Sequence, residues 1–365
     1  MSYFRSYSEL FNEVYVERAA SRLPAVERCR DGMPGSRFTL VEERRDIPAE
    51  HLRSSTLFLC RPRGEVFGRC PGTSGHVCCN YNTLDLYLGC TLGCSYCIMR
   101  TYLNFAPVTV YVDAQPGIDA VVRAAESNPG RQVRVGTGEV GDSLLLDPLF
   151  RLSEEFVRAF AGIDNVTFEM KTKTDLVDHL LDVDPKGNAV IGFSLSVPSV
   201  AQQEDGFSSS IDDRISAAGR AARAGYALAF HFDPIIQSET WSIEIDALVA
   251  KLRALGAYRV AWISMGTVRF PASLQESISD RPYMYDEFVP CRDGKFRYLQ
   301  KERIALYRRL RDLLRTVTDA PVYLCMESAA VWTTLFDAPP VAGPLFTRLS
   351  GIGNHPRLQK TGSSS

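Results

Sequence analysis

Long apolar segments are missing from this 365-residue sequence. No stretch reaches the roughly 18 consecutive apolar residues that a membrane-spanning helix requires. Residues 1–20 carry charged side chains throughout and lack the apolar core of a secretory signal. We therefore expect a soluble, cytoplasmic protein with no membrane contact.

An excess of charge of one sign is also missing. Lys and Arg total 41 against 43 Asp and Glu, which gives a formal net charge of −2. This balance excludes a strongly basic nucleic-acid-binding coat but not a local basic groove. The basic run at 301–315 has helical periodicity and predicts a solvated helix face, with phosphate contact as the alternative. Walker and dinucleotide-binding glycine loops are absent, so neither type of nucleotide site is predicted.

Short apolar runs alternate with helix-periodic segments from residue 83 onwards. The alternation predicts buried strands joined by helices, and hence an α/β fold whose sheet is either open or closed into a partial barrel. The chemistry of such a fold lies at the carboxyl ends of its strands. The predicted strands are residues 84–89, 132–138, 165–171, 189–197, 226–232 and 258–266, with 321–327 as a candidate seventh.

The regions on either side of this alternation have a different character. The first begins with a predicted helix and ends in a cysteine-rich loop or short hairpin. The residues expected on one face of that helix are Leu10, Phe11, Val14 and Tyr15. The predicted domains are an N-terminal helical and cysteine-rich extension at 1–82, the barrel at 83–270, and a C-terminal extension at 271–365 that ends in a disordered tail.

Ten cysteines need an explanation in a chain predicted to be cytoplasmic, and seven of them fall between residues 60 and 97. A reducing compartment favours metal binding or redox chemistry over disulfides. Cys90, Cys94 and Cys97 follow a predicted strand with the spacing C-x3-C-x2-C. A structural zinc site would need a fourth ligand, whereas three thiolates can hold three irons of a [4Fe–4S] cluster and leave the fourth iron open.

An open iron gives such a cluster a specific use. It can bind the amino and carboxylate groups of S-adenosylmethionine (SAM), and an electron from the cluster then cleaves the sulfonium and releases a 5′-deoxyadenosyl radical. Three unrelated buried cysteines or a zinc loop are the alternative interpretations of Cys90, Cys94 and Cys97.

This cysteine motif resembles that of the radical SAM superfamily, and the wider sequence resembles the spore photoproduct lyase family. The resemblance covers about residues 58–340 in unchanged order. It implies a partial (β/α)6 TIM-like radical SAM barrel, a [4Fe–4S] cluster and SAM as cofactors, and reduced flavodoxin or ferredoxin as electron donor. Members of the family use the adenosyl radical to abstract hydrogen from a thymine dimer and split a carbon–carbon link in DNA. The matching segments are residues 68–97, 172–182, 192–197, 211–235 and 268–270.

The resemblance also implies residues that bind SAM. The GTGE element at 136–139 resembles the superfamily's Gly-Gly-Glu element, in which backbone groups and the glutamate meet the ammonium of SAM. A lysine and a serine of the family lie near the SAM carboxylate, and an aspartate contacts the ribose or the substrate. The corresponding residues here are Gly138, Glu139, Asp142, Lys173 and Ser194. A solvated glutamate or lysine and a core hydroxyl are the alternatives at these positions.

The sequence departs from the family at two positions. Glu139 stands where the best-known spore photoproduct lyases carry the cysteine that donates a hydrogen atom. Tyr96 is kept beside the third cluster cysteine, but Ile98 replaces the aromatic residue on its other side. A relay from cysteine through two tyrosines therefore cannot run as the family implies, although Tyr96 stays a candidate catalytic residue.

Other side chains are candidates for the missing chemistry. A thiol is a good hydrogen-atom donor because its S–H bond is weak, and Cys79 and Cys325 are the candidate donors. His231 ends the fifth predicted strand, where it can act on a substrate proton, and Arg269 ends the sixth, where it can bind a phosphate. The alternatives are a conformational or second-metal role for Cys78 and Cys79, and core positions for Cys325 and His231.

Three functions stay open at this point. The first is a radical SAM lyase that repairs a thymine lesion in DNA. The second is a radical SAM tailoring enzyme that acts on a small nucleoside or nucleotide in natural-product biosynthesis, which the missing donor cysteine and the balanced charge favour. The third is a non-enzymatic iron–sulfur sensor. We expect hydrogen abstraction followed by carbon–carbon cleavage or rearrangement on a nucleic-acid-type substrate.

Overall fold

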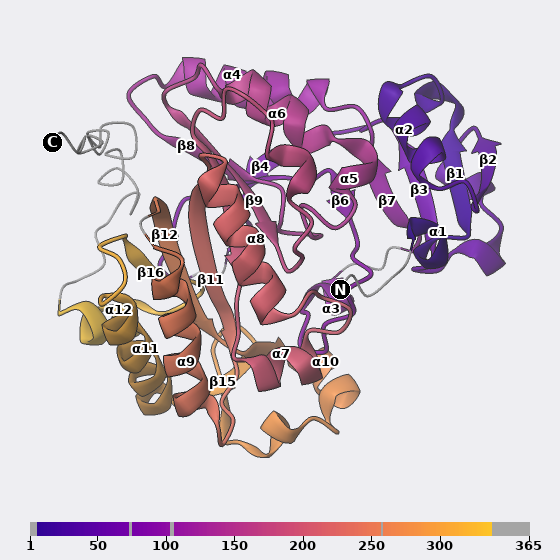
Figure 1. Ribbon diagram of the computed structural model, residues 1–365. Helices are drawn as coiled ribbons and strands as arrows, with labels where there is room; N and C mark the ends of the chain where they lie inside the picture. The colour runs from indigo at the N-terminus through magenta and orange to yellow at the C-terminus, as the bar shows by residue number, and fades with distance from the viewer. Residues whose placement is uncertain (1–5, 73–74, 103–105, 257, 338–365) are drawn as a thin grey trace, which may run out of the picture.

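An eight-stranded sheet, curled into a half-barrel, forms the centre of the molecule (Figure 1). The computed structural model describes residues 6–72, 75–102, 106–256 and 258–337. The strands run in the order β16-β12-β11-β10-β9-β8-β5-β4, and all neighbours pair in parallel except the edge strand β4. The predicted α/β fold with a partial TIM-like barrel is therefore confirmed. The strands are β4 (Phe67–Arg69), β5 (Asn82–Leu84), β8 (Val133–Gly136), β9 (Val166–Thr172), β10 (Ala189–Ser194), β11 (Ala227–Ile235), β12 (Val260–Thr267) and β16 (Val322–Leu324).

Long helices cover the outer face of this sheet (Figure 1). α8, for example, buries Ile211, Ile215 and Ala218 together with the charged residue Arg214. The start of α8 is fixed by Ser210, whose side chain accepts a hydrogen bond from the Asp213 backbone N–H. The covering helices are α4 (Gln115–Ser127), α6 (Leu152–Phe160), α8 (Ile211–Arg223), α9 (Trp241–Ala254) and α11 (Gln300–Leu314).

A second, five-stranded sheet lies beside the half-barrel (β1, β2 and β3 are indigo in Figure 1) and has the order β2-β1-β3-β7-β6. The helix predicted to carry Phe11 and Val14 on one face is wrong, because that helix ends at Leu10 and Val14 lies in a strand. The run EVYVE holds β-branched and aromatic residues, which favour an extended chain. The elements of this region are α1 (Tyr7–Leu10), β1 (Glu13–Glu17), α2 (Pro24–Gly32), β2 (Arg37–Val41), β3 (Thr56–Cys60), β6 (Tyr87–Leu88) and β7 (Val108–Tyr111).

The strand predicted at 84–89 is also wrong as a single element. The chain leaves the half-barrel after β5 and pairs again at β6, which is antiparallel to β7 in the other sheet. Asp85 lies at the crossing, where its backbone N–H donates to the Val66 carbonyl. Hydrogen bonding thus crosses the predicted boundary at residue 82, and β16 extends the half-barrel beyond residue 270. The division into three domains stays a prediction.

The C-terminal part closes one end of the half-barrel with a small antiparallel sheet in the order β13-β15-β14. The ring of Phe270 packs there against the rings of Phe288 and Phe296. The predicted disordered tail lies outside the described residues. No helix in the described ranges is long and apolar enough to cross a bilayer. The remaining elements are α3 (Met99–Tyr102), α5 (Asp147–Phe150), α7 (Pro198–Glu204), β13 (Arg269–Pro271), α10 (Ala272–Gln275), β14 (Phe288–Pro290), β15 (Lys295–Tyr298) and α12 (Ala329–Phe336).

Candidate active site

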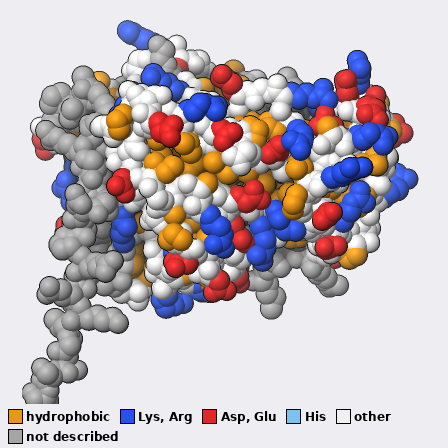
Figure 2. Space-filling model, turned by 90° about the horizontal axis from the view of Figure 1, so that it is seen from above, with side chains coloured by type: hydrophobic (Ala, Val, Ile, Leu, Met, Phe, Trp, Pro, Cys, Tyr) orange, Lys and Arg blue, Asp and Glu red, His pale blue; other side chains and the backbone are white. Residues whose placement is uncertain are grey.

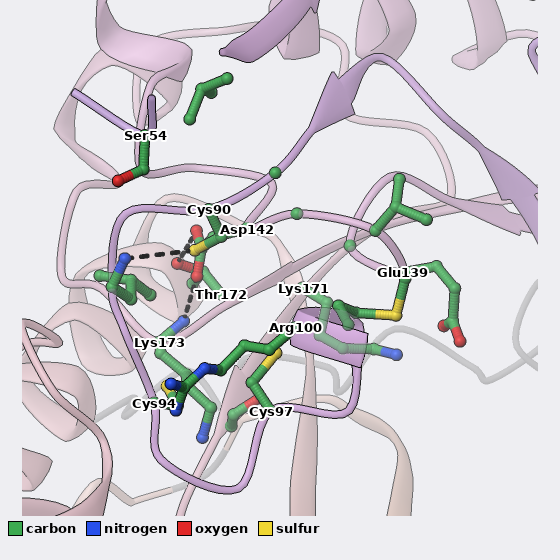
Figure 3. Close-up of a pocket in the computed structure, with 18 residues that line it drawn as sticks. Ser54, Cys90, Cys94, Cys97, Arg100, Glu139, Asp142, Lys171, Thr172 and Lys173 are labelled. Atoms are coloured by element: carbon green, nitrogen blue, oxygen red, sulfur yellow. Dashed lines mark hydrogen bonds between the residues drawn. The ribbon is translucent and has the colours of Figure 1, made fainter. Parts of the chain in front are cut away.

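The three motif cysteines lie on one loop between β6 and α3 (Figure 3). Cys90, Cys94 and Cys97 all line a cavity of about 400 Å³ at the carboxyl ends of β8, β9 and β10. The Leu92 backbone N–H donates to Cys90 Sγ over 3.5 Å, and the Cys94 thiol donates to the Asp205 carbonyl over 3.4 Å. Burial raises the pKa of Cys94 to about 12 and that of Cys90 well above its usual value. The expected position of the chemistry at the strand ends agrees with this cavity.

A short segment after α7 holds the cysteine loop from behind. The Phe207 backbone N–H donates to the Leu92 carbonyl over 2.7 Å, and the Ser95 N–H donates to the Glu204 carbonyl over 2.9 Å. Gly206 between them has a φ of +59°, and a Cβ there would lie 2.1 Å from the Leu92 oxygen. Only glycine permits this conformation and this close approach.

A buried carboxylate, Asp205, connects the loop to the barrel. It pairs with Lys173 over 3.2 Å and with Arg214 over 2.8 Å, and it accepts a hydrogen bond from the Tyr96 hydroxyl. Burial alone would raise the pKa of Asp205, but Lys173 and Arg214 lower it below its usual value. Sequence reasoning missed Asp205 and Arg214, since they approach the loop only through the fold.

The residues predicted to bind SAM all line the first cavity; they are Gly138, Glu139, Asp142, Lys173 and Ser194. Asp142 already accepts hydrogen bonds from the backbone N–H groups of Leu144, Leu145 and Lys173 and from the Thr172 hydroxyl. It therefore fixes the β8–α5 loop to the end of β9. Gly138 makes room for a neighbour on β9, because a Cβ there would lie 2.6 Å from the Lys171 Cβ.

A second cavity, of about 520 Å³, adjoins the first inside the half-barrel. The two cavities share Met99, Glu139, Val140, Lys171 and Ser194 in their linings. The predicted catalytic residues Cys79, His231 and Cys325 line the second cavity. Tyr96 lies outside the lining of both cavities, with its hydroxyl held by Asp205.

His231 belongs to a buried network on the floor of the second cavity. Its Nε2 lies 2.6 Å from Glu169 Oε1 and its Nδ1 lies 2.6 Å from Ser264 Oγ. The intervening strand β10 carries Gly192 at this point, where a Cβ would lie 2.8 Å from both Glu169 and His231. Arg134 donates to Glu169 over 3.0 Å. Burial lowers the pKa of His231, which therefore stays neutral at neutral pH.

Glu169 and Arg134 escaped the sequence analysis, although a signal was present. Each is a charged residue inside an otherwise apolar predicted strand, where a buried charge requires a partner. Burial alone raises the pKa of Glu169, but His231 and Arg134 lower it well below its usual value. The pair across β9 and β8 is therefore ionised.

Three thiols face the second cavity, from Cys70, Cys79 and Cys325. The Cys70 thiol donates to Glu139 Oε1 over 4.0 Å. Burial raises the pKa of Cys70 to about 11 and also raises that of Cys79, so both keep their S–H bond at neutral pH. The exposed Cys78 is not among the lining residues.

Arg269 lines the second cavity but already has a partner. Its guanidinium forms two hydrogen bonds with Asp233, of 2.8 and 3.1 Å, and approaches Cys325 Sγ to 3.9 Å. Gly266 provides the space for the Asp233 carboxylate, which would lie 2.8 Å from a Cβ. The phosphate contact proposed for Arg269 from the sequence stays a prediction.

Comparison with known proteins places these features in a family. The sequence profile of the family described as "Spore photoproduct lyase" matches residues 76–268, more than half of the chain. The chain is 29% identical to the spore photoproduct lyase of Bacillus subtilis (strain 168) over 46% of its own length and 49% of the relative. It is 28% identical to the spore photoproduct lyase of Geobacillus sp. (strain Y412MC61) over 43% of its own length and 47% of the relative. These alignments span about half the length of the curated relatives.

Solved structures extend the likeness of fold over most of the chain. A spore photoproduct lyase complexed with dinucleoside spore photoproduct superposes with a TM-score of 0.74 at 22% identity, covering 86% of this chain and 98% of that one. A mutant of spore photoproduct lyase with bound AdoMet and dinucleoside spore photoproduct gives the same TM-score and coverage at 21% identity. At this identity the superposition establishes the shared fold.

Proposed function

Because the chain belongs to the spore photoproduct lyase family, we propose that it is a radical SAM lyase that abstracts hydrogen from a thymine lesion and cleaves a carbon–carbon bond. The observation that carries this proposal is the junction of two cavities at Glu139 and Lys171. The motif cysteines line the first cavity, while His231 and three further thiols line the second. The first cavity suits a cofactor, and the second suits a substrate held next to it.

The motif cysteines fit a [4Fe–4S] cluster better than a single metal ion. They line one cavity, yet within the described parts of the chain no three His, Cys, Asp or Glu side chains converge closely enough to hold one ion. A [4Fe–4S] cluster takes one thiolate per iron, so its ligands stand apart. Cys90, Cys94 and Cys97 would hold such a cluster, which would supply the electron that converts SAM into a 5′-deoxyadenosyl radical. We propose reduced flavodoxin or ferredoxin as the electron donor.

The protein's own groups in the first cavity suit the ends of the SAM methionine. Glu139 is half-buried, and its carboxylate can accept the hydrogen bonds of an ammonium. Ser194 lies at the end of β10, with its carbonyl fixed by Arg214 over 2.8 Å, and its hydroxyl is a donor for a carboxylate. We propose positioning roles for Asp142, which anchors the β8–α5 loop, and for Lys173, which is paired with Asp205.

The second cavity is our proposed substrate site. The related solved structures hold dinucleoside spore photoproduct, and a thymine lesion of DNA is the substrate class we propose here. A thiol has a weak S–H bond, so Cys79 or Cys325 can give a hydrogen atom to a carbon radical on the substrate. His231 is neutral, and both of its ring nitrogens are held, by Glu169 and Ser264, so it can accept a substrate proton through the Ser264 hydroxyl, which lines the same cavity. Tyr96 is proposed to keep the cysteine loop in place through Asp205.

A small nucleotide is the second candidate substrate. Among the described residues on the face shown in Figure 2, Lys and Arg side chains are interspersed with Asp and Glu rather than gathered into a basic groove. Clustered Lys and Arg are what phosphate contacts along duplex DNA require. On this face the described residues thus form no such groove, and this is the observation that supports a small nucleotide as the second candidate.

The decisive experiment measures 5′-deoxyadenosine under anaerobic conditions. The cluster is reconstituted and reduced, and product is quantified with SAM alone, with a spore-photoproduct dinucleotide and with unmodified nucleotides. We expect the lesion to stimulate 5′-deoxyadenosine formation and to release thymine. Stimulation by an unmodified nucleotide alone would favour the second candidate. A loaded cluster that yields no 5′-deoxyadenosine under any of these conditions would contradict both and favour a sensor.

A further inference from the structure

The inward face of β9 carries three charged residues at successive levels of the half-barrel. Because strand side chains alternate, Glu169 and Lys171 point to the same side of β9, and Lys173, which directly follows the strand, lines the first cavity together with Lys171. Glu169 is paired on the cavity floor with Arg134, and Lys173 is paired beside the cysteine loop with Asp205. Lys171 lies between these levels, at the junction of the two cavities.

Lys171 differs from its two neighbours because its ammonium has no carboxylate partner. Within the described ranges, no carboxylate oxygen lies within 4.0 Å of Lys171 Nζ, and the ammonium makes no hydrogen bond. Its contact is with a ring, since Nζ lies 5.0 Å from the centroid of Tyr81. Burial alone would lower the pKa of Lys171, but the nearby Glu139 and Glu169 carboxylates raise it above its usual value. The ammonium therefore stays charged. A half-buried charge of this kind is normally paired with another charge or with a ligand.

The ammonium of Lys171 belongs to the second cavity more than to the first. The ammonium lies over the ring of Tyr81, which lines the second cavity and not the first. Tyr323 and Cys325, which also influence the pKa of Lys171, likewise line only the second cavity. In Figure 3 the side chains of Lys171 and Glu139 extend to the same side, away from Cys90 and Cys94.

Two other cations line the second cavity, and each has a carboxylate within 4.0 Å. Arg269 holds Asp233 through two hydrogen bonds, whereas Lys295 lies 3.8 Å from Asp293, a carboxylate that it shares with Arg297. Among the described residues that line this cavity, Lys171 is therefore the cation with no carboxylate within 4.0 Å, and an anionic group that enters can approach it without displacing an ion pair. The negative charge of Glu139 would repel such an anion, but in the proposed function the ammonium of SAM neutralises the Glu139 carboxylate.

We propose that Lys171 binds a phosphate of the substrate, so that the second cavity takes a nucleotide or phosphodiester rather than an uncharged nucleoside. This inference rests on the proposed function for the identity of the cavity as the substrate site. Lysine suits the task because its ammonium presents three donors and a point charge. The same chemistry would bind the SAM carboxylate, and the two sources are separated by measuring both ligands.

The test uses a ligand pair that differs in charge alone. Thymidylyl-thymidine and its uncharged methylphosphonate analogue are titrated by calorimetry into the reconstituted protein, with SAM present. We expect the phosphodiester to bind about 10- to 100-fold more tightly, the range that a charge-assisted hydrogen bond provides. In Lys171→Met this difference should vanish, and in Lys171→Arg part of it should return.

A matched control is available in Lys186, which also has its ammonium over a ring, at 5.4 Å from the centroid of Tyr226, but lines neither cavity. Lys186→Met should keep the full preference for the phosphodiester, and thermal unfolding of every variant shows that it is folded. Titration of SAM into Lys171→Met should give the wild-type affinity.

Three results would overturn the inference. The first is a preference for the phosphodiester that persists in Lys171→Met. The second is a Lys171→Met variant that loses affinity for SAM and not for the phosphodiester. The third is a wild-type protein that binds the two dinucleotides equally well. None of them depends on catalysis, so 5′-deoxyadenosine formation still tests the proposed function separately.

Discussion

The two parallel sheets of this protein bury different kinds of side chain. Along β1 and β3 of the N-terminal sheet most buried positions are apolar, as with Val14, Val16 and Leu57, and the buried charged residue there is Glu17, at the end of β1. In the half-barrel, neighbouring strands place Arg134, Glu169 and His231 in the interior at 4%, 0% and 3% exposure. Because buried charges are costly unless paired, such a network is retained only where the surrounding groups complete it.

This difference matches the roles that we assign to the two sheets, since the half-barrel carries the proposed active site and the N-terminal sheet is structural. The ion pairs of the N-terminal sheet reach solvent through their arginines, as in Arg61–Asp113 and Arg63–Glu17, whose arginine side chains are 45% and 62% exposed. The half-barrel also has pairs in which both partners are buried, with Arg134–Glu169 under the second cavity and Arg214–Asp205 behind the cysteine loop. We therefore expect equivalent substitutions in the two regions to have very different effects.

The largest effect is expected from the cysteines themselves. Cys97→Ala should abolish iron incorporation and 5′-deoxyadenosine formation, because a cluster ligand is lost. The measurement is iron and sulfide content per folded chain after anaerobic reconstitution. Cys60→Ala, which removes a buried thiol from β3 of the N-terminal sheet, is the matched control and should keep the full iron content. Equal iron content in both variants would contradict the assignment of the cluster.

The next largest effect is expected at the buried pair behind the loop. Arg214→Met leaves the fully buried Asp205 without one of its two cationic partners. We expect the free energy of unfolding to fall by about 3–5 kcal/mol, as for other broken buried pairs. Urea unfolding of the metal-free protein measures it. A loss below about 1 kcal/mol would mean that Lys173 alone neutralises Asp205.

A smaller effect concerns the floor of the second cavity and pH. The folded-state pKa of His231 lies below its usual value, mainly through burial, so the unfolded chain takes up the proton first as the pH falls. The stability from His231 is thus fully present above about pH 6.5 and declines on acidification, by up to about 1.4 kcal/mol per pH unit.

The measurement is urea unfolding of wild type and variants between pH 7 and 5. His231→Gln should flatten the decline, whereas Ser264→Ala, which keeps the imidazole, should preserve it. A decline of the same slope in wild type and His231→Gln would show that other groups cause it.

The sequence predicts the half-barrel well because its strands are continuous apolar runs separated by helical patterns. It predicts the three cysteines because their ligand spacing is local. It fails at residues 84–89, where two half-strands of different sheets are adjacent in sequence and their apolar residues read as one run. It also fails in the N-terminal sheet, where five-residue strands are too short for the strand and helix periods to be told apart.

The site divides in the same way. Residues next to a local motif, such as Glu139 and Lys173, were found from the sequence and line the first cavity. Asp205, Arg214 and Lys171 were not, because their importance comes from partners that the fold brings together or leaves out. Long-range pairing of charges has no local sequence signal beyond a charged residue in an apolar strand.

The smallest effect is expected at the rim of the N-terminal sheet, and it completes the comparison of the two regions. Arg61 pairs with Asp113 over 2.5 Å, with its side chain 45% exposed. Arg61→Met should lower the free energy of unfolding by no more than about 1 kcal/mol, because solvent and salt screen an exposed pair. Urea unfolding of Arg61→Met and Arg214→Met side by side compares the loss of an arginine at the rim of the N-terminal sheet with the loss of one from α8, which covers the half-barrel. Equal losses of unfolding free energy in the two variants would mean that burying an ion pair does not make it more important for stability, and would contradict the difference drawn between the two regions.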